Sequence, residues 1–512
     1  MLQTSSNKKI RVRFAPSPTG PLHIGGVRTA LFNYLFAKRH GGDFILRIED
    51  TDSARFVPGA EEYIIESLNW LGLKFDEGVG FGGAFAPYRQ SQRKHLYFKY
   101  AEQLVNSGNA YYAFDSSEEL DKIRKQHEEQ GKPFIYNHTV REKMKTSLNM
   151  NSIELQKRLN EEKHWVVRFK IPKHEEITMN DIIRGEIRVN TDTLDDKVLF
   201  KAADMLPTYH LANIVDDKLM EISHVIRGEE WLPSLPLHIL LYRAFGWQSP
   251  EFAHLPLLLK PDGKGKLSKR DGDRLGFPVF PMEWKNAEGE ISSGYRETGY
   301  FPEAVVNLLA LLGWNPGTEQ EIFSIDELVK NFSLERVIKS GAKFNPEKAR
   351  WFNQQYIRQK NNEELANLYQ PILKSKGINA NRNYVAAVCG LVKERATFIN
   401  DFWNLSSYFF IEPEIYDEKA TKKYWSDETP QQLQSLIEII DGKPFDKEKT
   451  EQTVHAWIAN SGLKTGNVMN ALRICIVGAA TGANMFDIID IIGKDETVKR
   501  IKKAINVINN RM

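Results

Sequence analysis

The sequence predicts an α/β domain built on a parallel sheet, interrupted by an α+β insertion and followed by an all-helical C-terminal region. A β-type run at residues 9–15 is followed by a helical pattern at residues 27–40 and a second apolar β-type run at residues 44–48. A helix between two such strands usually connects parallel neighbours of one sheet. Beyond about residue 300, helical patterns dominate the sequence.

The first helical pattern has one continuous apolar face. Its apolar residues recur at the i, i+3, i+4 spacing of a helix, and the paired glycines at residues 41–42 are typical of a helix end. The residues that share this face are Val27, Ala30, Leu31, Tyr34 and Leu35.

The pattern changes between about residues 87 and 206. Charged helical segments at residues 117–130 and 153–163 mix with strand-like runs at residues 165–171 and 187–190. We interpret this stretch as an inserted α+β domain, because it breaks the alternation of strand and helix. The alternation returns after residue 209, with a strand-like run at 222–226, a helical pattern at 236–245 and an apolar run at 255–259.

The C-terminal part is predicted to be helical from its start and stop signals. Pro302 lies near the start of a helical pattern that Gly313 closes. Residues 324–327 (SIDE) form a capping box, and residues 345–346 (Asn-Pro) open another helix. The last pattern, at residues 496–508, places its apolar residues on one face and its lysines off it.

Composition predicts a soluble, multidomain, cytoplasmic protein. A chain of 512 residues is too long for one core, so about three to five structural units are expected. The sequence lacks both a run of about 18 apolar residues and a signal-peptide pattern. Its two cysteines, Cys389 and Cys475, cannot form a disulfide framework or a multi-cysteine zinc cluster. The net charge of +2 neither implies nor excludes nucleic acid as a partner.

The loop at residues 15–26, APSPTGPLHIGG, is the first candidate for a ligand site. Its three prolines prevent the following helix from extending backwards. Gly25 and Gly26 lie at the start of that helix, where backbone N–H groups and the helix dipole favour an anion. The loop matches neither the Walker A motif nor the G-x-G-x-x-G fingerprint. Taken alone, it is equally well explained as a strand–helix turn with a surface histidine.

A second loop, residues 261–270, changes that balance. Its sequence, PDGKGKLSKR, has two glycines and four cationic side chains. Together, HIGG at residues 23–26 and KLSKR at residues 266–270 resemble the HIGH and KMSKS motifs of class I aminoacyl-tRNA synthetases. The departures, Gly26, Leu267 and Arg270, are similar to those of the glutamyl branch.

The resemblance extends over about residues 9–350. Six further stretches, in the same order, look like those of bacterial glutamyl-tRNA synthetases: RFAPSPTG (13–20), RIEDTD (47–52), VPGAEE (57–62), PYRQS (87–91), PTYHLAN (207–213) and VIRGEEW (225–231). This family has a Rossmann-type catalytic domain. Its activity joins glutamate to tRNA-Glu through a glutamyl-adenylate, with ATP and Mg²⁺.

The resemblance implies which residues contact ATP. His23, Lys266 and Lys269 are expected to be catalytic and to contact the reacting phosphates, while Gly25 leaves space for the adenine and ribose. Ser268 is expected to shape the loop at residues 266–270. Trp231 is expected beside the nucleotide.

A glutamate pocket needs guanidinium groups and one acid, because the substrate has two carboxylates and one ammonium group. The resemblance implies that Arg13 and Arg227 bind the side-chain carboxylate and that Glu49 binds the ammonium group. Both arginines end predicted strands, at the carboxyl edge where open α/β sites form. The other expected pocket residues are Ala15, Ser17, Tyr209 and Asn213. Arg55 is a weaker candidate for contact with the tRNA acceptor end.

The resemblance also predicts domains, metals and assembly. The expected order is a first half of the catalytic domain at residues 1–87, an acceptor-stem-binding insertion at 88–208, the second catalytic half at 209–260, a stem-contact domain with the KLSKR loop at 261–345, and a helical anticodon-binding region at 346–512 that divides near residue 410. Some relatives hold zinc through cysteines near the start of the insertion, but residues 111–115 (YYAFD) have none, and His127 and His138 alone cannot complete a tetrahedral site. We therefore expect no structural zinc, and, as in the family, a monomer.

Four alternatives stay open at this point. A glutaminyl-specific enzyme of the same class would share the sheet and loops but usually has a β-barrel anticodon region. A shorter relative that glutamylates a tRNA base would lack the C-terminal region. A catalytically inactive tRNA-binding paralogue would be expected to lose His23 or the lysines. A non-discriminating enzyme would also charge tRNA-Gln.

The role expected for Lys269 gives a first prediction. Removing a preorganised donor to the reacting phosphates typically costs about 3–4 kcal/mol, or roughly 10²–10³ in rate. Lys269→Ala is therefore expected to lose that much activity with the fold intact, measured as ATP–pyrophosphate exchange in the presence of tRNA. Near-normal exchange would contradict the role of Lys269.

Overall fold

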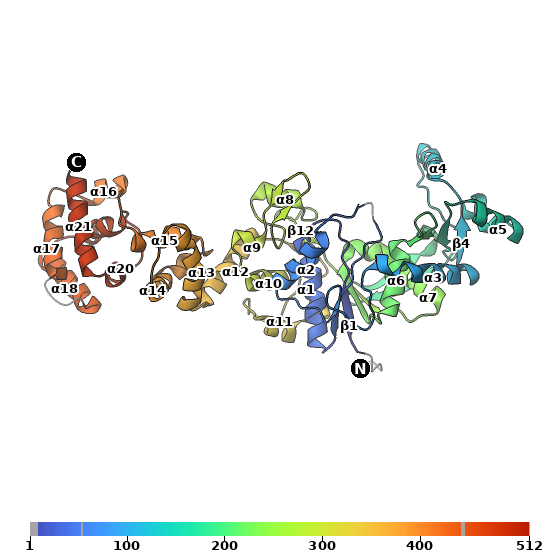
Figure 1. The fold of residues 1–512 in the computed structure, drawn as a ribbon, viewed down its shortest axis with the longest axis horizontal. Helices are drawn as coiled ribbons and strands as arrows, with labels where there is room; N and C mark the ends of the chain where they lie inside the picture. The colour runs from blue at the N-terminus through green and yellow to red at the C-terminus, as the bar shows by residue number, and fades with distance from the viewer. Residues whose placement is uncertain (1–8, 53–54, 442–445, 511–512) are drawn as a thin grey trace. The chain divides into compact units, whose positions relative to one another are not determined.

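The computed structural model describes residues 9–52, 55–441 and 446–510, leaving out the side chains of residues 269, 270 and 273. The chain forms two compact units (Figure 1). The first comprises residues 1–298 and 302–346, and the second comprises residues 299–301 and 347–512. In the described part of the chain, no helix has both the length and the apolar character needed to cross a membrane.

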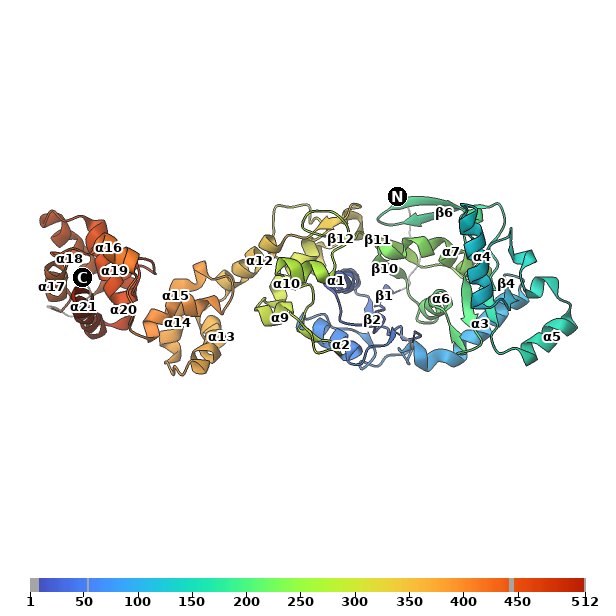
Figure 2. The same ribbon diagram turned by 90° about the horizontal axis from the view of Figure 1, so that it is seen from above.

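A parallel sheet lies at the centre of the first unit, as the sequence predicts. Strand β1 (Arg11–Phe14) pairs in parallel with β2 (Asp43–Leu46), which pairs with β3 (Glu77–Gly78). On its other side β1 lies beside β10 (His224–Gly228), and the backbone N–H of Ser223 donates to the carbonyl of Arg11. Strand β10 pairs in parallel with β11 (Glu251–Leu255). Figure 2 shows β2, β1, β10 and β11 following one another.

The helices of this domain connect the strands and cover the sheet. Helix α1 (Ile24–Arg39) follows β1 and begins three residues before the predicted start, because the side chain of His23 caps it. It packs against α10 (Pro302–Leu311) and α11 (Ile325–Asn331). The remaining helices of this part are α2 (Ala60–Trp70), α6 (Tyr209–Leu219) and α7 (Leu235–Phe245).

The expected insertion contains a second sheet. Its antiparallel strands are β4 (Ala110–Ala113), β5 (Val166–Phe169), β8 (Val198–Lys201) and β9 (Leu206–Pro207). Helix α3 (Lys94–Asn106) leads into it, and the charged segments form α4 (Ser117–Glu129) and α5 (Ser152–Glu161).

One hairpin of the expected insertion belongs to the parallel sheet instead. Strands β6 (Glu176–Asp181) and β7 (Gly185–Asn190) pair antiparallel with each other. The end of β6 then pairs in parallel with β11, where Asp181 lies opposite Phe252. Residues 88–208 are therefore not set apart from the sheet as the sequence pattern suggested.

The region of the KLSKR loop follows the last strand of the sheet. Strand β12 (Leu258–Leu259) pairs in parallel with β15 (Ala342–Lys343). Between them lie α8 (Lys269–Leu275), the hairpin of β13 (Trp284–Lys285) and β14 (Ile291–Ser292), and α9 (Tyr295–Thr298).

The second unit is helical throughout its described residues, which confirms the all-α prediction. Its helices pack around two apolar cores, one spanning residues 357–402 and the other residues 388–508. They are α12 (Pro346–Gln359), α13 (Asn362–Ser375), α14 (Arg382–Val392), α15 (Asp401–Phe410), α16 (Glu418–Tyr424), α17 (Thr429–Asp441), α18 (Lys447–Asn460), α19 (Thr465–Val477), α20 (Met485–Ile492) and α21 (Lys494–Asn509).

The buried carboxylate of Asp216 ties α3 to α6. It accepts hydrogen bonds from Arg93 Nε at 2.8 Å, from the hydroxyl of Tyr97 at 2.8 Å and from Gln90 Nε2 at 2.9 Å. The side chain of Asp216 has no exposed surface. Its charge is therefore compensated by these partners instead of by water.

Removing this charge should destabilise the first unit. Asp216→Asn leaves the buried guanidinium of Arg93 without its counter-ion, and breaking a buried pair in this way costs about 3–5 kcal/mol of unfolding free energy. Asp121→Asn is the control, because Asp121 pairs with Arg124 at the surface. Urea unfolding should show a clear loss for the first variant and no change for the second. Equal midpoints would contradict this role of Asp216.

Candidate active site

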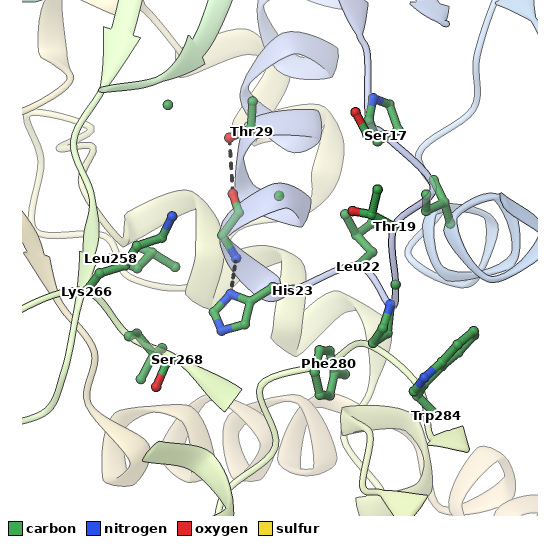
Figure 3. A pocket seen from close by; sticks show the side chains of 18 of the residues that line it. Ser17, Thr19, Leu22, His23, Thr29, Leu258, Lys266, Ser268, Phe280 and Trp284 are labelled. Carbon is green, nitrogen blue, oxygen red and sulfur yellow. Dashed lines mark hydrogen bonds between the residues drawn. The ribbon is translucent and has the colours of Figure 1, made fainter. Parts of the chain in front are cut away.

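A cavity of about 880 Å³ opens at the carboxyl end of the parallel sheet, where α1 begins. Figure 3 shows His23 between the wall that carries Lys266 and Ser268 and the wall that carries Phe280 and Trp284. The sequence-predicted residues that line the cavity are Ser17, His23, Gly25, Lys266 and Ser268. The sequence analysis did not single out Thr19 or Leu22, although both lie in the loop at residues 15–26. It also missed Arg28, Phe280 and Trp284, which lie outside the quoted motifs.

His23 directs one ring nitrogen into this cavity. Its Nδ1 accepts a hydrogen bond from the backbone N–H of Gly25 at 3.1 Å. Burial, together with the nearby positive charge of Lys266, lowers the pKa of His23 to about 4. The imidazole is therefore neutral at pH 7, and its proton is on Nε2. This buried Nε2 has no hydrogen-bond partner among the described residues, so its N–H is available to an acceptor on a ligand.

The backbone at the start of α1 is less available than the sequence suggested. The N–H of Ile24 donates to the carbonyl of Val279, and that of Gly25 donates to His23 Nδ1. The N–H groups of Gly26 and Val27 both donate to the carbonyl of His23. The expected row of bare backbone donors is therefore absent from these four residues. A bound anion would meet the helix dipole and His23 Nε2–H.

The two glycines at this helix start have different surroundings. A Cβ atom on Gly25 would meet only His23 Nδ1, at 3.5 Å, so the space above this residue is open. A Cβ atom on Gly26 would lie 2.6 Å from Leu22 Cδ1. Gly25 therefore leaves room for a ligand, whereas a side chain on Gly26 would require Leu22 to move.

The KLSKR loop faces the cavity from the opposite side. Lys266 Nζ lies 3.2 Å from Glu230 Oε1, and both side chains are exposed. Leu267 is buried, which anchors the loop directly after Lys266. Ser268 donates from its backbone N and its Oγ to Asp271, at 3.0 and 2.5 Å. Lys269 begins α8, but its side chain lies outside the described residues.

A buried charge cluster lies next to the cavity. Asp217, on α6, accepts from Arg13 Nε at 3.0 Å and Nη2 at 3.2 Å, and from Arg47 Nη1 at 2.7 Å. Arg47 Nη2 then donates to Glu49 Oε1 at 2.9 Å, and Asn213 Nδ2 donates to the same oxygen at 3.0 Å. The two guanidinium groups hold the pKa of Asp217 below its usual range, although burial opposes them.

This cluster leaves two groups of opposite charge uncommitted. Arg13 Nη1 and Glu49 Oε2 have no hydrogen-bond partner in the part of the chain that the structure describes. One can receive a carboxylate and the other an ammonium group. Sequence reasoning found Arg13 and Glu49, but it missed the residues that orient them, Arg47 and Asp217.

Arg227 occupies the neighbouring strand, β10. Its Nη1 donates to the hydroxyl of Tyr209 at 2.9 Å, and its Nε lies 3.0 Å from His254 Nε2. Burial lowers the pKa of Arg227, and the positive charge of Arg13 acts in the same direction. The ring of Trp231 lies 4.4 Å from that of Tyr209 and does not line the cavity. Trp231 thus packs against Tyr209, which contacts Arg227, and not against the cavity where the nucleotide was expected.

The chain between β1 and α1 joins the two sets of residues. The backbone N–H of Arg47 donates to the carbonyl of Phe14, and that of Glu49 donates to the carbonyl of Pro16. Ala15 lies between these two bonds, and Ser17 follows at the rim of the cavity. Residues 13–25 therefore border both the charge cluster and the cavity. Arg55 lies apart, exposed and paired with Asp52.

One group of possible metal ligands occurs among the described residues, in the expected insertion. The ligand atoms of His138, His174 and Asp192 lie within 4.8 Å of one another. His174 Nδ1 lies 2.8 Å from Asp192 Oδ2, so two of the three already bond each other. His127, which the zinc expectation named together with His138, is not in this group, and its ring contacts that of Phe134. The expectation that no structural zinc is present stays a prediction.

Comparison with known proteins assigns the chain to a family. Residues 9–351 match the model of the catalytic domain of class I tRNA synthetases for glutamate and glutamine (E and Q), and residues 364–505 match an anticodon binding domain. The first unit thus has the catalytic domain of a class I tRNA synthetase.

Individual relatives narrow the assignment. The glutamate–tRNA ligase of Flavobacterium johnsoniae is 60% identical over 98% of this chain and 100% of its own length. That of Porphyromonas gingivalis is 59% identical over 98% of this chain and 99% of its own length. The crystal structure of a glutamate tRNA ligase from Elizabethkingia meningosepticum, in complex with its amino acid, matches with a TM-score of 0.94 and 52% identity, over 98% of this chain and 99% of that one. The chain belongs to the glutamate–tRNA ligase family.

The open space above Gly25 gives a test of the cavity. Gly25→Ala should fold normally, because its Cβ atom meets no close neighbour, but it should raise the KM for ATP at least about tenfold by occupying the ligand's space. Gly466→Ala is the matched control, because its Cβ atom also meets no close neighbour and Gly466 does not line the cavity, so the KM for ATP should stay unchanged. An unchanged KM for ATP in Gly25→Ala would show that the nucleotide binds elsewhere.

Proposed function

We propose that this protein joins L-glutamate to tRNA-Glu in two steps that consume ATP. In the first step the α-carboxylate of glutamate attacks the α-phosphorus of ATP, forming glutamyl-adenylate and releasing pyrophosphate. In the second step a ribose hydroxyl of the 3′-terminal adenosine takes the glutamyl group and AMP leaves. The observation that carries the proposal is that residues 13–25 border both the charge cluster and the cavity.

ATP is proposed to occupy the cavity. The unpartnered Nε2–H of His23 would donate to a phosphate oxygen, and Lys266 would neutralise charge from the opposite wall. The first step is a displacement at phosphorus, in which positioning and charge neutralisation supply most of the rate acceleration. Lys269 is proposed to act with them. Mg²⁺ would accompany the phosphates, as is usual for nucleotide substrates.

Glutamate is proposed to bind against the charge cluster. Glu49 Oε2 would receive its ammonium group, and Arg13 Nη1 and Arg227 would hold its side-chain carboxylate. Tyr209 and Asn213 would complete the pocket, with Ala15 and Ser17 between the amino acid and ATP. This arrangement would place the α-carboxylate towards the cavity, where the α-phosphorus must lie for the first step.

tRNA is proposed to contact both units. The insertion and Arg55 would contact the acceptor end, and the helical unit would bind the anticodon. Phosphate contacts supply much of such an affinity, so binding should weaken steeply with added salt. Since tRNA and ATP are cytoplasmic substrates, we expect the protein to act in the cytoplasm, as a monomer without structural zinc.

Two alternatives are less well supported. A glutaminyl-specific enzyme would be expected to have a β-barrel anticodon region, whereas the described residues of the second unit are helical. An inactive paralogue would not be expected to keep the unpartnered donor of His23 together with the charge cluster. A non-discriminating enzyme would charge tRNA-Gln in addition to tRNA-Glu, a choice set by anticodon contacts.

Charging assays test the proposal directly. Purified protein is incubated with ATP, labelled glutamate or glutamine, and either tRNA-Glu or tRNA-Gln. We expect glutamyl-tRNA-Glu and no product from glutamine. Glutamate on both tRNAs would indicate the non-discriminating enzyme. The absence of charging and of ATP–pyrophosphate exchange with tRNA present would contradict the proposed function.

A further inference from the structure

A buried polar chain runs across three adjacent strands of the parallel sheet and ends at Arg227. It consists of Asp181 at the end of β6, His254 on β11 and Arg227 on β10. Arg227 and His254 lie opposite each other in the strand register. All three side chains are buried, and that of His254 has no exposed surface. No step of the proposed reaction uses Asp181 or His254.

The contacts in this chain fix the protonation of the histidine. Arg227 Nε lies 3.0 Å from His254 Nε2, and an arginine nitrogen can only donate, so Nε2 must be an acceptor. His254 must then carry its proton on Nδ1, which lies 2.7 Å from Asp181 Oδ2. Burial also lowers the pKa of His254, as does the charge of Arg227, against the opposing effect of Asp181.

Asp181 is itself held in place by the backbone. Its Oδ1 accepts from the N–H groups of Ile183 at 3.0 Å and Arg184 at 2.8 Å, in the turn between β6 and β7. Its carboxylate also accepts from the N–H of His254. The oxygen that faces the imidazole is therefore fixed by the turn of the hairpin.

At the Arg227 end of this buried polar chain, one guanidinium nitrogen is left for a ligand. Its Nε contacts His254, and its Nη1 donates to Tyr209 at 2.9 Å. Its Nη2 makes only a long contact, 3.4 Å, with the carbonyl of Trp231. A carboxylate can displace such a contact, since a charged acceptor forms the stronger hydrogen bond.

We infer that Asp181 and His254 are positioning residues that hold the guanidinium of Arg227 so that its Nη2 faces the side-chain carboxylate of glutamate. The inference rests on the proposed role of Arg227. It assigns to the β6–β7 hairpin, through Asp181, a contribution to amino-acid binding. Without the acceptor at His254 Nε2, the Arg227 Nε–H would be left unpaired in a buried site, and the guanidinium would rotate to find another partner.

Two substitutions of His254 separate this role from simple packing. In His254→Gln the amide oxygen can take the place of Nε2 and still accept from Arg227. In His254→Asn the shorter amide can reach Asp181 but not Arg227. We expect the KM for glutamate to rise about tenfold or more in His254→Asn and to change less than about threefold in His254→Gln. The KM for ATP should be unchanged in both.

Asp181→Asn tests the proton assignment. The backbone donors at Oδ1 favour an amide oxygen there, which turns the amide NH₂ towards His254 Nδ1. The histidine would then carry its proton on Nε2, where it would face the N–H of Arg227 and could no longer accept from it. Asn has nearly the same shape as Asp, so packing should not change. We therefore expect Asp181→Asn to raise the KM for glutamate about tenfold as well. His224→Asn is the matched control. His224 is on the same strand, β10, and contacts Ser223 and Phe36.

The outcomes distinguish this inference from the proposed function. Equal effects of His254→Gln and His254→Asn on the KM for glutamate, or losses that follow the melting temperature and the KM for ATP, would show a structural role and overturn the inference. If Arg227→Lys raises the KM for glutamate but His254→Asn and Asp181→Asn do not, the inference alone fails. If Arg227→Lys has no effect on that KM, the proposed role of Arg227 fails.

Discussion

The carboxylate of Asp217 is the interaction on which the site depends. It is buried on α6 and pairs with two arginines, Arg13 at the end of β1 and Arg47 just after β2. Two guanidinium groups this close would repel each other in a dry environment, and Asp217 supplies the charge between them. The same contacts direct Arg47 towards Glu49. A residue that contacts no proposed substrate therefore sets the positions of those that do.

The site also depends on where the chain leaves the sheet. Residues 14–16 continue the pairing of β1 through bonds to the backbone of Arg47 and Glu49, although β1 ends at Phe14. The chain then turns into α1, whose first residues make their own hydrogen bonds. The loop has little freedom to move either set of residues alone. Its prolines are consistent with this, since each fixes one backbone angle and removes one donor.

The sequence predicted the larger part of the fold because its patterns were local. Periodicity located the first strands and α1, and the shift in α1's start came from a capping side chain that periodicity does not register. The strand-like run at residues 187–190 was expected to belong to the insertion, but it lies in β7, whose partner β6 pairs with the parallel sheet. The side chains of β6 alternate between buried and exposed, as in any antiparallel pair, so nothing local indicates that Asp181 pairs with a strand about 70 residues later.

The site could be predicted only as far as its motifs extend. The motifs supplied His23, Lys266 and the two pocket arginines, but an aspartate on an amphipathic helix is more often exposed, and Asp217 was not singled out. The backbone donors of α1 were predicted to be free because the sequence does not show Val279 approaching Ile24. In both cases the missing information is a contact between residues distant in the chain.

The pair between Lys266 and Glu230 would make the proposed binding of ATP in this cavity an exchange of counter-ions. Before ATP arrives, the cation on the loop already has an anionic partner at the mouth of the cavity. A phosphate that reaches Lys266 has to replace that carboxylate, and since the pair is exposed its loss costs little. A single free phosphate gains little from the exchange. A triphosphate, which could reach His23 at the same time, would gain more, so a preference for the larger anion would come from His23 and not from the weak exposed pair.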